Sequence, residues 1–412
     1  MTTGTRPTPG TGPRPSRDLR GAAAMGLTAA LVALGLIPTA GAGRIQSALR
    51  SLHALEANRA DHEKHAAGYY VGLIDGEAGP GRDELALALL GKPGDWISFH
   101  DVGAARYLPG DFLQFELLPG VDKPVFGSRF TTNSAGLRDR PYPVEKPPGV
   151  FRIAVLGSSM DMGWGVGTDE TYENQLEDWL NAHAAKRGLS RRFEVLNFAM
   201  AAYSPLHRLE SLERKALAYR PDLVLYAATR LDTRLLQIHL VGLLQDRVDL
   251  KHDFVRRAVA GAGIADGDLT LDPEGVLQNK NQIKAKLEPA LWPLGEAAVA
   301  RLAEDCRSAG VPLALLIIPR ASELDGPESR GPDVARFRAL ASRLGLPIAD
   351  LSATFDDHDP SALEIAAWDD HPNALGHRLL FLALGRQIVE DAPLYRLIFD
   401  ADPSALGPLP EE

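Results

Sequence analysis

Strand-like and helix-like segments alternate from residue 151 to about residue 389, and this alternation limits the fold more than any other feature of the chain. The predicted strands are short apolar runs, and the helices between them carry apolar residues at helical spacing. The strands cover 151–156, 193–198, 223–227, 313–318 and 347–351, and the helices cover 170–186, 206–219, 298–308, 334–344 and 374–389. This order predicts an α/β protein whose parallel sheet has helices on both faces.

The rest of the chain divides around this main domain, which is predicted to span residues 150–392. Consecutive prolines in VEKPPG (144–149) mark its start, because proline blocks both helix and sheet pairing. Residues 76–150 lack periodicity and predict a small irregular or β-rich lead-in. Residues 233–292 interrupt the alternation and are interpreted as an insertion that could form a lid. Residues 393–412 are interpreted as a C-terminal tail.

The N-terminal region predicts export. Residues 1–20 are rich in Pro, Thr, Gly and Arg and predict a disordered cytoplasmic head, and its arginines precede an uncharged stretch at 21–43. That stretch has the length of a transmembrane signal anchor, although Ala40-Gly41-Ala42 also resembles the cleavage site of a signal peptide. Either would place the remaining chain outside the cytoplasm, and a cytoplasmic protein is the third alternative. Residues 44–149 would then comprise an amphipathic stalk helix, to about residue 70, and the lead-in.

Two short segments carry side chains suited to nucleophilic catalysis. Gly157-Ser158-Ser159 follows the first predicted strand, where an open parallel sheet presents ligand-binding groups. Far downstream, WDDHPNALGH (368–377) supplies His371 next to acidic residues. Together they offer a nucleophile, a base and an orienting carboxylate.

Charge and cysteine content exclude other classes of function. The formal net charge of −10 argues against a nucleic-acid-binding protein, because phosphate contacts need clustered Lys and Arg. The single cysteine, Cys306, rules out an intramolecular disulfide and offers no zinc framework. We interpret it as a buried structural thiol. The acidic turn at 355–360 is interpreted as solvated, so no metal site is expected.

Residues 150–392 resemble the SGNH, or GDSL-like, family of serine esterases and acylhydrolases. The family carries Gly-Asp-Ser after its first strand, and Gly157-Ser158-Ser159 matches it with Ser158 in place of the aspartate. The onward spacing to Gly163 and Gly165 also resembles the family. The resemblance implies a flavodoxin-like three-layer α/β/α sandwich with Ser159 as the nucleophile.

The two family blocks that supply the oxyanion hole are altered. The segment that begins at Asn197 looks like the second block with its glycines changed to alanine, so that Ala202 matches the oxyanion glycine. Its backbone N–H can persist as a donor, provided that Ala202 has a negative φ. In the third block, Leu231 stands where the family has an asparagine, and loss of such a donor costs about 10²- to 10³-fold in rate. Arg230 is a candidate substitute cation or a surface ion-pair residue, and Asp232 is interpreted as structural.

The last family block places an aspartate two or three residues before the histidine. Asp369 is therefore the expected orienting carboxylate and His371 the expected base, with Asp370 as the less favoured alternative. His377 is interpreted as a packed residue. Trp164, close to the serine, either lines an acyl or sugar pocket or packs in the core.

The sequence therefore predicts a serine esterase or acylhydrolase with a Ser159-His371-Asp369 triad and an oxyanion hole at Ser159 and Ala202. No metal or organic cofactor is expected. The expected substrate is an extracytoplasmic ester, such as an O-acetyl group on a polysaccharide or a lipid acyl ester, and the N-terminal segment would hold the protein at the membrane. The alternatives are an O-acyltransferase, which passes the acyl group to a sugar hydroxyl, and a catalytically silent binding module with the same fold.

Overall fold

The computed structural model describes residues 97, 99–273, 275–320, 326–366 and 369–400. The expected head (1–20), the anchor or signal segment (21–43) and the stalk helix lie outside the described residues. Within the part of the chain that the structure describes, no helix is both long and apolar enough to cross a membrane.

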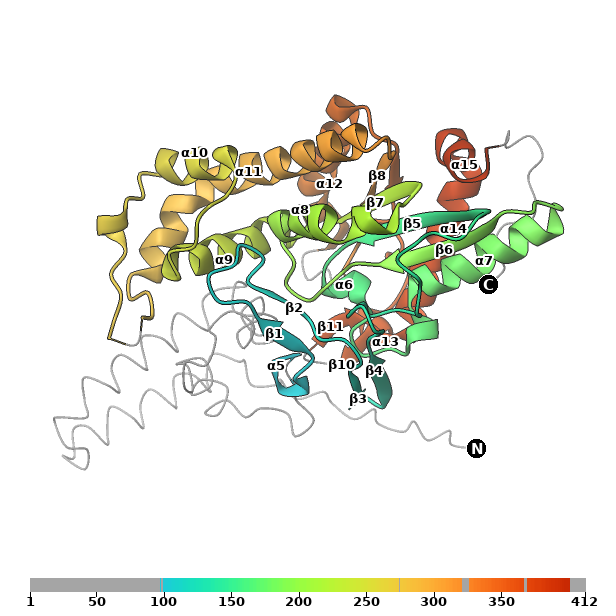
Figure 1. Ribbon diagram of the computed structural model, residues 1–412, viewed down its shortest axis with the longest axis horizontal. Helices are drawn as coiled ribbons and strands as arrows, with labels where there is room; N and C mark the ends of the chain where they lie inside the picture. The colour runs from blue at the N-terminus through green and yellow to red at the C-terminus, as the bar shows by residue number, and fades with distance from the viewer. Residues whose placement is uncertain (1–96, 98, 274, 321–325, 367–368, 401–412) are drawn as a thin grey trace, which may run out of the picture. The chain divides into compact units, whose positions relative to one another are not determined.

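Five parallel strands form the central sheet (Figure 1). They are β5 (Val150–Leu156), β6 (Arg192–Asn197), β7 (Leu223–Ala228), β8 (Leu313–Ile317) and β9 (Ile348–Asp350). Their order in the sheet is β6-β5-β7-β8-β9, and every neighbouring pair is parallel. This is the flavodoxin-like order, in which the chain reverses direction across the sheet beside the first strand. The predicted alternation is thus confirmed.

Helices cover both faces of the sheet because the strand side chains alternate between two apolar cores. In β5, Ile153 and Val155 point into one core while Ala154 and Leu156 point into the other. The first core is closed by α7 (Tyr172–Lys186), α14 (Ala374–Glu390) and α15 (Ala392–Phe399), and the second by α8 (Pro205–Arg214), α11 (Lys280–Ser308) and α12 (Gly326–Leu344). The three-layer sandwich is therefore confirmed.

The segment after residue 392 differs from the expected tail, because α15 packs into the first core. Asp391 caps this helix by accepting a 2.9 Å hydrogen bond from the N–H of Leu394. The apolar residues that follow are buried at Leu394, Tyr395, Ile398 and Phe399. Their spacing is helical, so the main domain extends to the end of α15.

The region interpreted as an insertion forms a helical cluster with its own apolar core. It contains α9 (Asp232–Gln245), α10 (Asp253–Gly261), the 3₁₀ turn η3 (Asp266–Asp268) and the first half of α11. The expected start of a helix at residue 298 is wrong, since α11 begins at Lys280 and continues through Pro289 and Pro293. Buried apolar residues at helical spacing, such as Ile283 and Leu287, hold it together across these prolines. Cys306 is buried near its end.

The lead-in is built from the short helix α5 (Phe99–Val102) and two antiparallel hairpins. The hairpins pair β1 (Ala105–Tyr107) with β2 (Phe115–Leu117), and β3 (Asp122–Val125) with β4 (Ser128–Thr131). Their apolar side chains share one cluster with Met162, Trp164 and the loop at 199–203. The lead-in therefore packs against segments that leave the carboxyl ends of β5 and β6.

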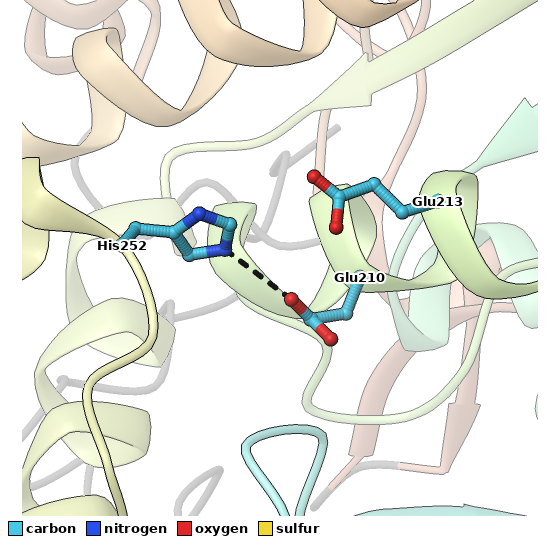
Figure 2. Close-up of side chains that lie close together, drawn as sticks. All are labelled: Glu210, Glu213 and His252. Carbon is cyan, nitrogen blue, oxygen red and sulfur yellow. Dashed lines mark hydrogen bonds and ion pairs between the residues drawn. The ribbon is translucent and has the colours of Figure 1, made fainter.

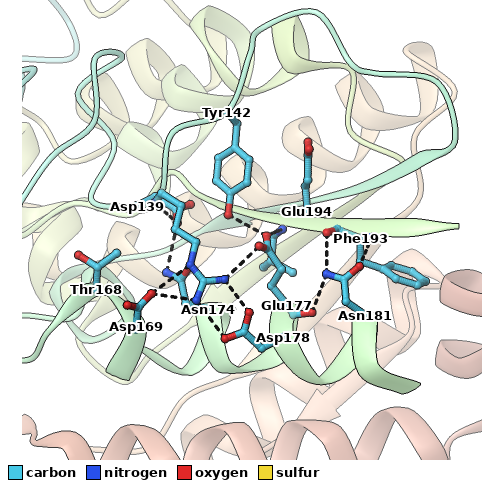
Figure 3. Close-up of polar contacts among 12 residues, drawn as sticks. Asp139, Tyr142, Thr168, Asp169, Asn174, Glu177, Asp178, Asn181, Phe193 and Glu194 are labelled. Carbon is cyan, nitrogen blue, oxygen red and sulfur yellow. Dashed lines mark hydrogen bonds and ion pairs between the residues drawn. The ribbon is translucent and has the colours of Figure 1, made fainter. Parts of the chain in front are cut away.

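A polar network fastens the end of the lead-in to the sandwich (Figure 3). The Asp139 carboxylate accepts a 2.7 Å hydrogen bond from the backbone N–H of Asn197 at the end of β6. Arg140 forms ion pairs with Asp169 and Asp178, at 2.8 and 2.7 Å. These bonds reach both β6 and α7, so the boundary at 144–149 is not a flexible joint between independent units.

Candidate active site

Ser159 begins the short helix α6 (Ser159–Met162) directly after β5, and its side chain is buried. The backbone N–H of the preceding residue, Ser158, donates a 2.8 Å hydrogen bond to Asp161, which holds the sharp turn from strand to helix. Because β5 lies between β6 and β7, Ser159 occupies the position at which ligands bind in doubly wound sheets.

His371 lies on β11 (Asp369–Pro372), which pairs with β10 (Glu364–Ala366) in a hairpin outside the main sheet. Its Nε2 lies 2.7 Å from the Oγ of Ser159. Its Nδ1 contacts the Oδ1 of Asp369, which also accepts the backbone N–H of His371 at 3.1 Å. The structure thus brings together the three residues expected to form the triad.

The charges around His371 and Asp369 favour a proton on the His371 imidazole and a negative charge on Asp369. Burial opposes the charged form of His371, but the Asp369 charge and hydrogen bond outweigh it, and its pKa is raised. Burial likewise favours neutral Asp369, yet the charge of His371 and hydrogen bonds from His371 and Trp164 lower the pKa of this carboxyl. Asp369 is therefore ionised at neutral pH, and it stabilises a positive charge on His371.

Trp164 lies in the apolar cluster that it shares with the lead-in. Its side chain is fully buried, and its indole N–H donates a 2.9 Å hydrogen bond to the Oδ2 of Asp369. Of the two interpretations of Trp164, packing in the core agrees with this burial. The sequence pattern missed this contact because the two residues are 205 positions apart.

Ala202 has a φ of 63°, so the condition of a negative φ, under which its N–H was expected to persist as an oxyanion donor, is not met. The left-handed region costs a residue with a Cβ about 1–2 kcal/mol, and the surrounding fold imposes it here. Ala202 is buried, and within the described residues no acceptor takes its backbone N–H. The loop is tied to α6 through Asn197, whose Nδ2 donates to the carbonyl oxygen of Asp161 at 2.8 Å.

In the third block, Arg230 takes part in an ion pair. Its Nε lies 3.4 Å from the Asp333 carboxylate on α12, which agrees with the alternative of an ion-pair residue. Leu231 packs against the apolar cluster that also contains Ala202. Asp232 is buried and pairs with Arg208, with Nη1 to Oδ2 and Nη2 to Oδ1 both at 2.9 Å.

Arg320 is a site neighbour that the sequence analysis did not find. It forms an ion pair with Asp370, and its charge opposes protonation of His371. Asp370 therefore pairs with Arg320, and its charge also contributes to the raised pKa of His371. Arg320 lies three residues after β8. Like Ser159, it follows the carboxyl end of a parallel strand, and this position could have indicated that it lies near the site.

Beneath α6 lies a buried cluster of acids and amides. Burial raises the pKa of Asp161 to about 6 and that of Glu173 to about 8. Asp161 accepts a 2.9 Å hydrogen bond from the Tyr172 hydroxyl, and His377 accepts the backbone N–H of Tyr172 at 3.2 Å. His377 is packed, as expected, and burial lowers its pKa to about 3.

Among the described residues, two groups of side chains have the composition of a metal site, but their donor atoms are already engaged. Figure 2 shows Glu210, Glu213 and His252 together, and His252 Nε2 lies 3.2 Å from Glu210. Lys251 binds Glu213 at 2.8 Å and Arg214 binds Glu210 at 2.6 Å, so cationic side chains already neutralise these carboxylates. In the group at 369–371, the same atoms contact Ser159 and Arg320.

A cavity of about 400 Å³ lies between the lead-in, the loop at 198–203 and α8. It is lined by Phe198, Met200 and Tyr203 of the loop, and by Leu108, Leu113, Arg214 and Lys215 from elsewhere. Neither Ser159 nor His371 lines it, so it is separate from the candidate catalytic centre.

Comparisons with known proteins found no match among protein-family models and none among curated proteins. Solved structures that resemble the chain include an acetylxylan esterase from Geobacillus stearothermophilus, with a TM-score of 0.38 and 16% identity over 58% of this chain and 94% of that one. An alpha/beta hydrolase from the metagenome of Lake Arreo, Spain, has a TM-score of 0.33 and 18% identity, over 57% and 92%. A psychrotrophic esterase from Pseudoalteromonas sp. has a TM-score of 0.35 and 14% identity, over 58% and 97%.

Proposed function

We propose that this chain is an SGNH-type serine ester hydrolase in which Ser159 is the nucleophile, His371 the general base and Asp369 the orienting carboxylate. The observation that carries the proposal is the 2.7 Å contact between the Oγ of Ser159 and the Nε2 of His371, whose other ring nitrogen contacts Asp369. A nucleophile, a base and an orienting acid in hydrogen-bond sequence are the geometry of acyl transfer through a serine.

The reaction follows from these contacts. His371 takes the proton from Ser159 as its oxygen attacks the carbonyl carbon of the ester, and Asp369 stabilises the imidazolium that forms. The oxyanion of the tetrahedral intermediate accepts hydrogen bonds from the backbone N–H groups of Ser159 and Ala202. The positive φ of Ala202 turns this N–H but does not remove it, and no acceptor among the described residues takes it. His371 then gives its proton to the leaving alcohol, and an acyl-serine remains. Water, deprotonated by the same imidazole, attacks this ester, and His371 returns the proton to the oxygen of Ser159 as the acid is released.

The proposed substrate is an extracytoplasmic ester, either an O-acetyl group on a polysaccharide or a lipid acyl ester. This part of the proposal comes from the N-terminal sequence, where arginines precede the uncharged stretch at 21–43. An anchored or secreted enzyme would meet acylated glycans and lipids at the cell surface. Membrane attachment through that segment belongs to the same proposal.

The test is hydrolysis of p-nitrophenyl acetate by the full-length protein, together with labelling by a fluorophosphonate. Ser159→Ala should abolish turnover and labelling, and His371→Ala should lower turnover by at least about 10³-fold. The neighbouring Ser158 is a matched control, since its buried hydroxyl has no hydrogen-bond partner within the described residues. Ser158→Ala should keep activity within about threefold, as should replacement of the exposed His358 by Ala.

The presence of Leu231 in place of the family asparagine favours the alternative of a catalytically silent binding module, because one oxyanion donor is lost. Turnover at background level, unchanged by Ser159→Ala and without labelling, would overturn the hydrolase proposal in favour of that module. Rapid labelling of Ser159 with slow hydrolysis that an added sugar acceptor accelerates would identify an O-acyltransferase.

A further inference from the structure

We propose that Trp164 is a positioning residue that orients Asp369 toward His371, and that the lead-in, by clamping Trp164, belongs to the catalytic apparatus. This inference rests on the proposed serine-hydrolase function. It assigns a role to a residue outside the triad and to the segment 97–131, which precedes the main domain.

The Asp369 carboxylate is held from two sides. Its Oδ1 faces the ring and the backbone N–H of His371. Its Oδ2 accepts the indole N–H of Trp164 at 2.9 Å, the one donor to this atom within the described residues. Because the carboxylate is almost completely buried, water cannot readily replace that donor. The hydrogen bond from the indole therefore sets how the carboxylate is rotated about its Cβ–Cγ bond. Because the other carboxylate oxygen faces His371, this rotation also sets the orientation of the imidazole.

Trp164 itself is fixed by the lead-in. Three phenyl rings meet its indole edge to face, those of Phe99, Phe126 and Phe130, with centroids at 5.5, 5.7 and 6.1 Å. Such contacts favour one orientation of the indole, because they match the positive edge of one ring to the negative face of another. The indole N–H is thus aimed by residues that precede the main domain in the chain.

The turn that carries Trp164 also contacts the hairpin that carries Asp369. Gly163 and Gly165 flank the indole with φ values of 76° and 79°. A Cβ on Gly165 would lie 2.3 Å from the Cδ1 of Ile365 on β10. Glycine therefore lets the Trp164 turn and the β10–β11 hairpin approach closely, which brings the indole within reach of the carboxylate.

The decisive test is a double-mutant cycle in the full-length protein. Trp164→Phe deletes the N–H and should lower kcat/KM for p-nitrophenyl acetate by about 10- to 100-fold, the worth of a buried hydrogen bond to a charged group. In an Asp369→Ala background the same replacement should change the rate by less than about threefold, because its target is gone. A structural role alone would lower the rate equally in both backgrounds, and that result would overturn the proposal.

A second variant guards against misfolding. Incorporation of 3-benzothienylalanine at Trp164 replaces the indole N–H with sulfur and keeps the shape of the ring. It should reproduce the rate loss of Trp164→Phe without the loss of packing that a smaller ring causes, in a protein that remains folded at the assay temperature. An activity like that of the unmodified protein would show that the N–H does not position Asp369.

The clamp is tested by paired replacements within the lead-in. Phe99→Leu should lower kcat severalfold with little change in KM, because Phe99 contacts Trp164. Phe112→Leu is the control, since that buried ring packs against His239 and His252 instead. It should lower stability and leave kcat within about twofold. Equal losses of kcat in both variants would remove the lead-in from the proposal.

Failure of the proposal and failure of the hydrolase function can be told apart by proton NMR. The His371 Nδ1–H that faces Asp369 should give a far-downfield resonance, which needs no substrate. The benzothienyl replacement should shift this resonance even if the protein hydrolyses no ester. A resonance that stays in place would overturn the positioning role independently of activity.

Discussion

Ser159 and His371 are 212 positions apart in the chain, yet the Oγ of one lies 2.7 Å from the Nε2 of the other. The serine follows a strand of the main sheet, whereas the histidine lies on a separate hairpin. Their contact is therefore a product of tertiary packing, and it depends on where β10 and β11 are held.

The pH dependence of turnover should report His371. The imidazole must be neutral to accept the serine proton, and its pKa is raised by Asp369 above the ordinary value near 6.5. We therefore expect kcat/KM to fall on acidification, with the midpoint of this limb above pH 6.5. In Asp369→Asn the negative charge is lost, so the limb should move to lower pH while the plateau falls by about 10²- to 10⁴-fold.

The control for this pH profile is Asp357→Asn, which removes a charge from an exposed position. Its profile should superimpose on that of the unmodified protein. An acid limb that Asp369→Asn leaves in place would show that His371 does not titrate as the base, or that Asp369 does not act on it.

Much of the fold was predictable because it depends on local patterns. The run at 151–156 is apolar throughout, as expected for a strand buried on both faces, and β5 includes all of it. Asn373 directly precedes the helix predicted at 374–389 and is a residue type that commonly caps helices, and it accepts a 3.1 Å hydrogen bond from the N–H of Gly376. Such features depend on neighbours within a few residues.

The remaining features depend on contacts that no local pattern encodes. The indole of Trp164 and the carboxylate of Asp369 meet only after the hairpin docks. The helix α11 runs through Pro289 and Pro293 because its apolar face is buried, although each proline favours a break. The positive φ of Ala202 reverses the local preference of alanine, and only the fold around it explains this.

Ala202→Gly should stabilise the protein while it retains turnover. Glycine removes the strain of the left-handed conformation but raises the entropy of the unfolded chain, so the free energy of unfolding should rise by up to about 1 kcal/mol. Ala201→Gly is the matched control, because Ala201 is buried in the same loop without a positive φ. It should destabilise the protein by about 0.5–1 kcal/mol. Urea unfolding curves measure both variants, and equal destabilisation would contradict the strain at Ala202.

Leu231→Asn should restore an oxyanion donor. Leu231 packs in the cluster that contains Ala202, so an amide at this position would lie close to the proposed oxyanion hole. We expect kcat on p-nitrophenyl acetate to rise by about 10-fold or more. One well-placed oxyanion donor contributes about 10²- to 10³-fold in rate, and the new amide should recover part of this. Leu231→Ala removes the apolar contact without adding a donor and should not raise kcat. If both variants behave alike, the position does not face the reacting carbonyl.

The Arg208–Asp232 pair should contribute to stability and not to chemistry. Arg208 is fully buried, and its guanidinium meets both oxygens of Asp232. Asp232→Ala would leave that charge buried without its partner, so the free energy of unfolding should fall by about 3–5 kcal/mol. The double variant with Arg208→Met and Asp232→Leu should recover most of the lost free energy of unfolding, because no buried charge then remains unpaired. Urea unfolding curves measure the free energies of unfolding. Values of kcat measured well below each melting temperature test whether the pair contributes to stability alone. A large fall in kcat for Asp232→Asn at undiminished stability would instead place this carboxylate in the catalytic machinery.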